Sequence, residues 1–134
     1  MAIALSERYA LSEDGRPDVI IPVPLHVSRL RDRGYNQALE LARPIANRLN
    51  IPIDYQSCVR IRETAAQADL PAKLRRSNVK GAFQIHKLDA EYVAIIDDVM
   101  TTGYTVAELS RQARNAGVKK IDIWTCARAS LVRR

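Results

Sequence analysis

The sequence is poor in cysteine. Its 134 residues include only two, Cys58 and Cys126, which lie far apart, and no Cys-x-x-Cys pair or Cys/His cluster is present. Tetrahedral zinc sites are built from such groups of ligands. We therefore expect no zinc in this chain, and we expect both cysteines to be reduced and buried.

Long apolar runs and aromatic residues are also scarce. No apolar stretch approaches the roughly 20 residues that a membrane-spanning helix needs. The first ten residues, MAIALSERYA, lack the basic start and the apolar length of a signal peptide. These absences predict a cytoplasmic protein without membrane insertion. Aromatic residues make up only 5% of the chain, so stacking platforms for single-stranded nucleic acid are not obvious.

Negative charge is in deficit. The chain has 21 Lys and Arg against 15 Asp and Glu, a formal net charge of +6. This excess suits a phosphorylated ligand or a nucleic-acid backbone, although a basic solvated surface would look the same. The basic residues are spread over several groups: Arg29, Arg31 and Arg33; Arg60 and Arg62; Lys73, Arg75, Arg76 and Lys80; Arg133 and Arg134.

Strand-like and helix-like segments alternate along the chain, which favours an α/β fold with a mostly parallel sheet. The length allows one packed core, so we expect a single domain over 1–134, with a lead-in helix fragment and loop at 1–17. The basic segment 26–37 is expected to be a loop. Strands are predicted within 18–25, 51–61, 81–85, 92–97 and 119–127, and helices at 2–10, 38–49, from about 71, and 106–116.

Three of these helices carry terminal signals. Asn36 could cap the helix at 38–49, in which Pro44 predicts a kink or a late start. Thr105 and Glu108 match a capping box for the helix at 106–116. Gly117 stands where a left-handed glycine ends a helix, and Pro71 suits the first turn of a short helix.

The most informative stretch is VAIIDDVMTTGYT, residues 93–105. An apolar strand ends in Asp97 and Asp98, and ligands of parallel α/β sheets bind at the carboxyl ends of strands. We expect the chain to turn here, so that both carboxylates can face one ligand. Ionised carboxylates are acceptors only. They would match the 2- and 3-hydroxyls of a ribose, or a hard cation such as Mg²⁺.

The loop behind the two acids is made of small, uncharged residues. Gly103 permits close approach of the backbone, and the helix that follows presents the positive end of its dipole. Such a loop is a cradle for a phosphate, so acids and cradle together predict a ribose 5-phosphate. The purely structural alternative is that the acids and Thr105 only cap a turn and a helix. A Walker B strand would need a Gly-x-x-x-x-Gly-Lys-Ser/Thr loop, which the sequence lacks.

Three stretches together resemble a known family. VAIIDDVMTTGYT is similar to the phosphoribosyl pyrophosphate (PRPP) motif of type I phosphoribosyltransferases. PVPLHVSRLRDRGYNQALELA (22–42) and RETAAQADLPAKLRRSNVKGAF (62–83) resemble the ComF family, which consists of competence-associated, phosphoribosyltransferase-like proteins and includes the GntX type. The resemblance spans roughly 18–127. It implies the type I phosphoribosyltransferase fold, with a mainly parallel five-stranded sheet flanked by helices.

The resemblance also implies roles for individual residues. Asp97 and Asp98 would hold the ribose hydroxyls and, with Arg62, form the catalytic set. Mg²⁺ would be bound through the ligand and through the same two acids. The other implied roles are binding of the 5-phosphate by Thr101, Thr102, Gly103, Tyr104 and Thr105, binding of pyrophosphate by Pro24, Leu25, His26, Arg29 and Arg33, and a flexible loop that contains Thr64 and Gln67.

Two functions are compatible with this resemblance. The first is a PRPP-binding domain that transfers phosphoribosyl to an unknown acceptor, releases pyrophosphate and is linked to competence and DNA uptake. The alternative is a non-catalytic protein that handles single-stranded DNA and uses PRPP only as a ligand. Neither the zinc module usual in the family nor an acceptor-selecting hood is visible in this sequence. Expected partners are PRPP or a related phosphorylated ribose, single-stranded DNA, and a second copy or a competence protein.

Overall fold

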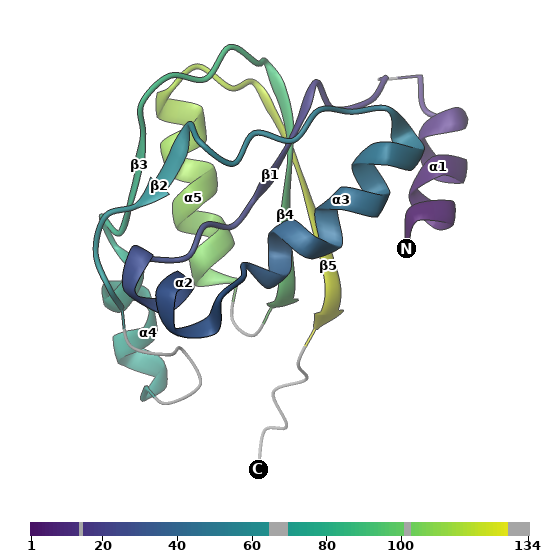
Figure 1. The fold of residues 1–134 in the computed structure, drawn as a ribbon. Coiled ribbons are helices and arrows are strands. Elements are labelled where there is room, and N and C mark those ends of the chain that lie inside the picture. The colour runs from purple at the N-terminus through teal and green to yellow at the C-terminus, as the bar shows by residue number, and fades with distance from the viewer. Residues whose placement is uncertain (14, 65–69, 101–102, 129–134) are drawn as a thin grey trace.

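The computed structural model describes residues 1–13, 15–64, 70–100 and 103–128 (Figure 1), without the side chains of residues 2, 3, 72 and 128. Helices and strands alternate along most of the chain, as expected. The helices are α1 (Ala2–Ala10), α2 (Val27–Arg33), α3 (Gln37–Leu49), α4 (Ala72–Val79) and α5 (Tyr104–Asn115), and the strands are β1 (Val19–Pro22), β2 (Cys58–Arg60), β3 (Phe83–Ile85), β4 (Tyr92–Met100) and β5 (Lys120–Arg128).

The main sheet is parallel, with the strand order β1-β4-β5. Val19 pairs with Val93 on one side of β4, and Lys120 pairs with Tyr92 on the other. An isolated parallel bridge joins Ile53 to Ile20. The α/β class is confirmed, but the expected strand count differs within the described residues. The strands β2 and β3 form a separate antiparallel pair, so the main sheet has three strands.

Both faces of β4 are covered, which makes the structure three-layered (Figure 1). Val93 and Ile95 pack with α5 and the β2–β3 pair, whereas Ala94 and Ile96 pack with α1 and α3. This alternation follows from the period of two along a strand. It also explains why the sequence of β4 is apolar at consecutive positions, as is usual for a parallel strand between two layers.

Helix α1 is attached to the sheet by a polar cluster. The Tyr9 hydroxyl donates to the Asp122 carboxylate and accepts a hydrogen bond of 3.1 Å from Nε1 of Trp124. The Tyr92 hydroxyl donates to the same carboxylate at 2.6 Å. Helices of nine residues are marginal in isolation, so these contacts, with the packing of Tyr9, hold α1 in place.

Segment 26–37 is not the loop that we expected, because Val27–Arg33 forms helix α2. Nδ1 of His26 accepts from the Ser28 backbone N–H at 3.3 Å, and Gly34 ends the helix with a left-handed φ of 79°. A side-chain N-cap and a C-terminal glycine are the usual helix boundaries. His26 is an infrequent cap, which is why the sequence pattern did not indicate this helix.

Three further expectations are corrected. The capping box is wrong, because Gly103 is the N-cap of α5, Thr105 lies inside the helix, and the Glu108 carboxylate accepts from the Gly81 N–H at 3.1 Å. The chain does not turn at the acids, since β4 continues to Met100. Cys58 is buried, as expected, whereas Cys126 is exposed.

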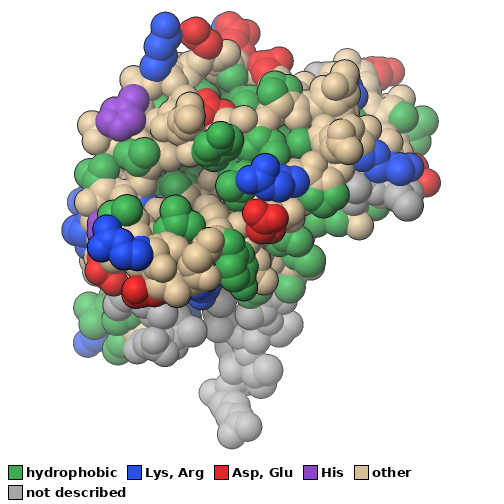
Figure 2. Space-filling view, in the orientation of Figure 1, with side chains coloured by type: hydrophobic (Ala, Val, Ile, Leu, Met, Phe, Trp, Pro, Cys, Tyr) green, Lys and Arg blue, Asp and Glu red, His purple; other side chains and the backbone are tan. Residues whose placement is uncertain are grey.

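Surface charge and helix length bear on the partners expected above. Figure 2 shows Lys and Arg side chains as separate groups among acidic and uncharged ones, so the face that it draws carries no continuous basic patch. Of the helices in the described part of the chain, none is long and apolar enough to cross a bilayer.

The Asn36 cap is confirmed and leads to a first prediction. Its Oδ1 accepts from the N–H groups of Ala38 and Leu39, at 3.0 and 3.4 Å, while its Nδ2 donates to the Val23 carbonyl at 3.1 Å. Asn36→Ala should therefore lower the free energy of unfolding by about 1–2 kcal/mol, measured by urea denaturation. Asn47→Ala, an exposed position on the same helix, should change it by less than about 0.5 kcal/mol. Equal effects of the two substitutions would contradict the capping role.

Candidate functional site

The acid pair lies at the carboxyl end of β4. Asp97 and Asp98 are both half-buried. By strand alternation, Asp97 follows Val93 and Ile95 onto the face covered by α5 and the β2–β3 pair. Burial, followed by a hydrogen bond and charge repulsion from Asp98, raises the pKa of Asp97 from 3.8 to about 7. A carboxyl group whose pKa is shifted this far by burial and a like charge is a common mark of a functional site.

The start of α5 follows the acids closely in sequence. Gly103 is the N-cap, with φ of 83° and no side-chain cap, and Tyr104 and Thr105 open the helix. Among the described residues, an added Cβ at Gly103 would contact the Met100 sulfur at an ordinary distance of 3.7 Å. The N-terminus of α5 presents the positive end of its dipole at this point. Thr101 and Thr102, the other expected cradle residues, lie outside the described residues.

The segment that follows β1 lies at the carboxyl end of the sheet, next to the acid pair. The Val23 N–H donates to the carbonyl of Ile96, the residue before the acid pair, at 2.9 Å. Pro24 and Leu25 are half-buried and lead into α2, whose first turn is capped by His26. His26 therefore has a structural task in this structure, in addition to the pyrophosphate contact that the resemblance implies.

The two arginines of α2 differ in their surroundings. Arg29 is half-buried, and its Nη2 donates to the Thr64 carbonyl at 2.8 Å. The structure thus brings together a residue expected at the pyrophosphate and one expected in the flexible loop. Arg33 is exposed in the last turn of α2. Gln67 lies outside the described residues.

Arg60 joins this group although we did not place it in the site. Its Nη2 donates to the Thr64 hydroxyl at 3.0 Å, and its guanidinium lies 5.1 Å from the centre of the Phe83 ring. Burial, then the charge of Arg29, lowers the pKa of Arg60, while the charge of Asp97 acts in the opposite direction. The sequence carried one signal for it, a cation between the two apolar residues Val59 and Ile61.

Arg62 points elsewhere. It is exposed, and its Nη2 donates to the carbonyls of Asn78 and Lys80, at 2.9 and 2.7 Å. Those carbonyls lie at the end of α4, so in this structure Arg62 binds the C-terminus of that helix. The structure does not bring it into the group formed by Arg29, Arg60 and Thr64.

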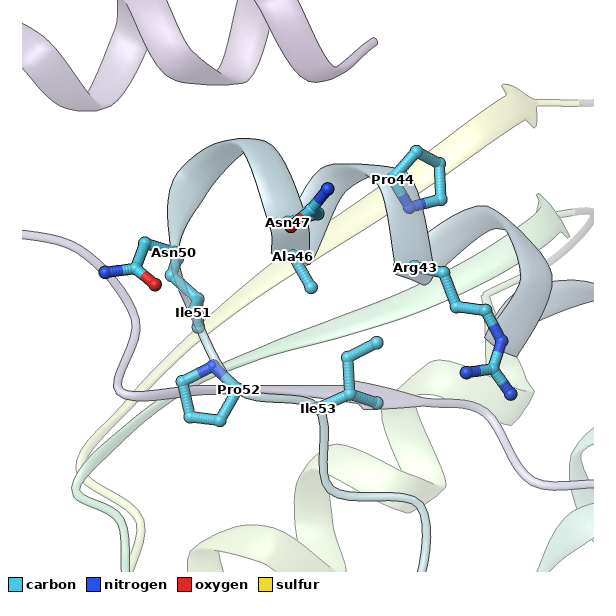
Figure 3. Close-up of a pocket in the computed structure, with 8 residues that line it drawn as sticks. All are labelled: Arg43, Pro44, Ala46, Asn47, Asn50, Ile51, Pro52 and Ile53. Carbon is cyan, nitrogen blue, oxygen red and sulfur yellow. The ribbon is translucent and has the colours of Figure 1, made fainter.

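A pocket of about 680 Å³ lies apart from these residues. It is formed by the second half of α3 and the segment that follows (Figure 3). Among the described residues that line it, Arg43 is the charged one, and Pro44, Pro52 and Ile53 are also part of the lining. It shares no residue with the site described above, and its described lining residues include no carboxylate.

Metal binding would depend on the acid pair and a ligand. No group of three or more His, Cys, Asp or Glu that could hold a metal occurs among the residues that the structure describes. Mg²⁺ is commonly bound by one or two carboxylates together with substrate phosphates. Asp97 and Asp98 fit that pattern, since their mutual repulsion would be relieved by a cation.

The raised pKa of Asp97 predicts a pH effect on stability. Between pH 4 and 7 the folded protein keeps a proton that the unfolded chain has lost, so stability should fall as the pH rises through this window. Asp97→Asn removes this dependence. The free energy of unfolding of Asp97→Asn, relative to that of wild type, should therefore increase from about pH 4 to 7.5 by on the order of 2 kcal/mol. This magnitude follows from about 1.4 kcal/mol per pKa unit, reduced because Asp97 and Asp98 titrate as a coupled pair. Urea denaturation of both proteins across this range measures it. A constant difference would contradict the shift.

The chain has close relatives among curated proteins. It is 43% identical over 117 residues to competence protein F of Haemophilus influenzae, a match covering 84% of this chain and 51% of that protein. It is 39% identical over 113 residues to DNA utilization protein YhgH of Salmonella typhi, covering 84% and 50%. The chain thus spans about half the length of the curated relatives that it matches. No protein-family model matches it.

Solved structures give the fold. A purine phosphoribosyltransferase from Pyrococcus horikoshii matches with a TM-score of 0.59 and 24% identity, over 98% of this chain and 75% of that one. A hypoxanthine phosphoribosyltransferase from Staphylococcus aureus matches with a TM-score of 0.51 and 18% identity, over 99% and 65%. The expected resemblance is confirmed: the chain is a homologue of about half of the competence protein F and YhgH proteins, and it has the phosphoribosyltransferase fold.

Proposed function

We propose that this chain is a PRPP-binding domain of the phosphoribosyltransferase type. The observation that carries the proposal is the acid pair at the end of β4, followed at once by the helix that Gly103 opens. Carboxylates that can accept from ribose hydroxyls and a helix N-terminus that can bind a 5-phosphate are then adjacent in the chain. The phosphoribosyltransferase fold of the chain supports the same ligand class.

The residues have separate tasks in this proposal. Asp97 and Asp98 accept hydrogen bonds from the ribose hydroxyls, and Gly103, Tyr104 and Thr105 bind the 5-phosphate together with Thr101 and Thr102. Pro24, Leu25, His26, Arg29 and Arg33 form the pyrophosphate side. Mg²⁺, bound by the ligand phosphates and by the acid pair, would supply positive charge at the pyrophosphate.

In a transfer reaction the acceptor would attack the anomeric carbon of PRPP. The bond from that carbon to the pyrophosphate oxygen breaks, and the pyrophosphate leaves with the electron pair. Positioning of the two reactants and stabilisation of the leaving charge would supply the catalysis, and no nucleophilic side chain is required. The acceptor is not identified by any residue of this site.

The names of the relatives support a cellular context for the proposed ligand chemistry. They are named as a competence protein and as DNA utilization proteins. We therefore propose that the domain acts in the uptake or use of DNA, in the cytoplasm. The match covers about half of the length of those proteins. The proposed role therefore concerns the half that this chain matches.

The alternative function is the handling of single-stranded DNA with PRPP as a ligand only. Helix α2 supports it, because Arg31 and Arg33 are exposed there, as are Leu30 of the same helix and Tyr35 shortly after it in the chain. Basic and aromatic groups side by side are typical of single-strand binding. The face drawn in Figure 2 offers no continuous basic track.

The phosphate cradle yields a test with a matched control. Gly103→Ala adds a methyl group to the backbone that would bind the 5-phosphate, and should weaken ribose 5-phosphate binding at least about tenfold, a loss of about 1.4 kcal/mol. Isothermal titration calorimetry of the folded proteins measures this.

Gly117→Ala is the control. Gly117 has a φ of 102° at the other end of α5, with open space around it, so both substitutions introduce similar backbone strain. Only Gly103→Ala should affect the ligand. Equal binding by both variants and the wild type would remove the cradle from the proposal.

The DNA alternative predicts a salt dependence. If about 4 phosphates of a single strand are neutralised, the plot of log affinity against log salt should have a slope near −3, at roughly 0.7 per phosphate. Arg31→Ala with Arg33→Ala should reduce the slope by about 1.4. Both slopes are measured by fluorescence anisotropy with a labelled oligonucleotide, between about 50 and 200 mM salt, where phosphate contacts change affinity strongly. A flat response, or no binding at low salt, would exclude this function for the chain.

A further inference from the structure

Arg60 is held in one orientation by contacts on several sides. Its guanidinium lies over the Phe83 ring, at 5.1 Å from the ring centre, and donates to the Thr64 hydroxyl at 3.0 Å. Its backbone is fixed as well, because Arg60 pairs with Phe83 between β2 and β3. A long, flexible side chain is thus ordered in advance, which reduces the entropy that a bound anion would otherwise have to offset.

The Nε of Arg60 is buried without a hydrogen-bond partner, and it is the single such side-chain atom in the described part of the chain. An N–H of a charged guanidinium that is removed from water without an acceptor is unfavourable. The four ion pairs among the described side chains all lie elsewhere. Arg60 therefore carries an unused donor and forms no close ion pair among the described side chains.

Thr64 brings a second guanidinium to the same place. Arg29 donates to the Thr64 carbonyl at 2.8 Å, while Arg60 donates to its hydroxyl. Thr64 is 6% exposed, so the contact is shielded from water. Two cations bound to one small residue repel each other, and the charge of Arg29 does act against that of Arg60. Such a pair becomes favourable when an anion lies between or beside the two groups.

We propose that Arg60 binds the diphosphate group of the ligand together with Arg29, and that Thr64 sets the spacing of the two guanidiniums. Each guanidinium is a planar donor that can contact phosphate oxygens in pairs, and a diphosphate offers two phosphates to two such groups. Asp97, which also acts on Arg60 electrostatically, would lie on the ribose side of this arrangement. Arg60 thereby becomes a ligand-binding residue of the leaving-group side, an inference that rests on the proposed function.

The test uses ligands that differ in the diphosphate. Wild type, Arg60→Gln, Arg60→Lys and Arg43→Gln are titrated by calorimetry with PRPP, inorganic pyrophosphate and ribose 5-phosphate. Arg60→Gln should weaken PRPP and pyrophosphate at least about tenfold, as loss of a charged hydrogen bond does, and leave ribose 5-phosphate within about twofold. Arg60→Lys keeps the charge without the planar fork and should be intermediate. Arg43, exposed and paired with Glu40 on α3, is the matched control and should bind as wild type.

The outcomes distinguish a failure of the proposed function from a failure of the role of Arg60. If the wild type binds neither PRPP nor ribose 5-phosphate, the proposed function fails and this inference fails with it. If wild type binds both but Arg60→Gln retains PRPP, or loses both ligands equally, only the role of Arg60 is overturned. Should Arg60→Gln not fold, Arg60→Lys decides the question, since equal binding of PRPP and pyrophosphate by it and by wild type would exclude a guanidinium contact.

Discussion

The parallel pairing of β4 between β1 and β5 is the constraint on which the site depends. Val93, Ala94, Ile95 and Ile96 are completely buried, and each large side chain of this kind contributes roughly 1.5–3 kcal/mol on burial. Because the four alternate between the two helical layers, the register of β4 cannot slip without exposing apolar groups on both faces. That register fixes where Asp97 and Asp98 leave the core.

The electrostatics of the site follow from this placement. Asp97 is carried to the edge of the core beside another carboxylate, which raises its pKa to about 7. Arg60, which is close enough to Asp97 to feel its charge, and Arg29 both contact Thr64. The carboxylates and the two guanidiniums therefore form two neighbouring groups, one of acceptors and one of cations. A ligand with hydroxyls at one end and phosphates at the other would match both groups, whereas a simple anion or a simple cation would match only one.

The parts of the structure that the sequence predicted are those governed by local pattern. The strand that begins at Tyr92, the helix capped by Asn36 and the left-handed Gly117 all follow from hydrophobic period or from terminal residues. Helix α2 was missed because its cap is a histidine ring, which has no strong sequence signal. The length of β4 was underestimated because two adjacent acids resemble a turn, although pairing with β5 carries the strand on to Met100.

In the candidate site, too, only the residues that are neighbours in the chain could be predicted. Asp97, Asp98 and Gly103 lie in one stretch of sequence, and that stretch indicated them. Arg60 could not be predicted, because its partners Arg29, Thr64 and Asp97 come from three other segments and meet it only through the fold. The family resemblance implies a catalytic role for Arg62, and the sequence did not indicate that its side chain contacts the carbonyls at the end of α4.

The most direct measurement is a crystal structure of this protein with PRPP and Mg²⁺ bound. The account predicts ribose hydroxyls on Asp97 and Asp98, the 5-phosphate at the N-terminus of α5 beside Gly103, and the diphosphate against the guanidiniums of Arg29 and Arg60. Ordered PRPP at another place, for example in the pocket beside α3, would contradict the account. So would crystals soaked to saturation that show no ligand at the end of β4.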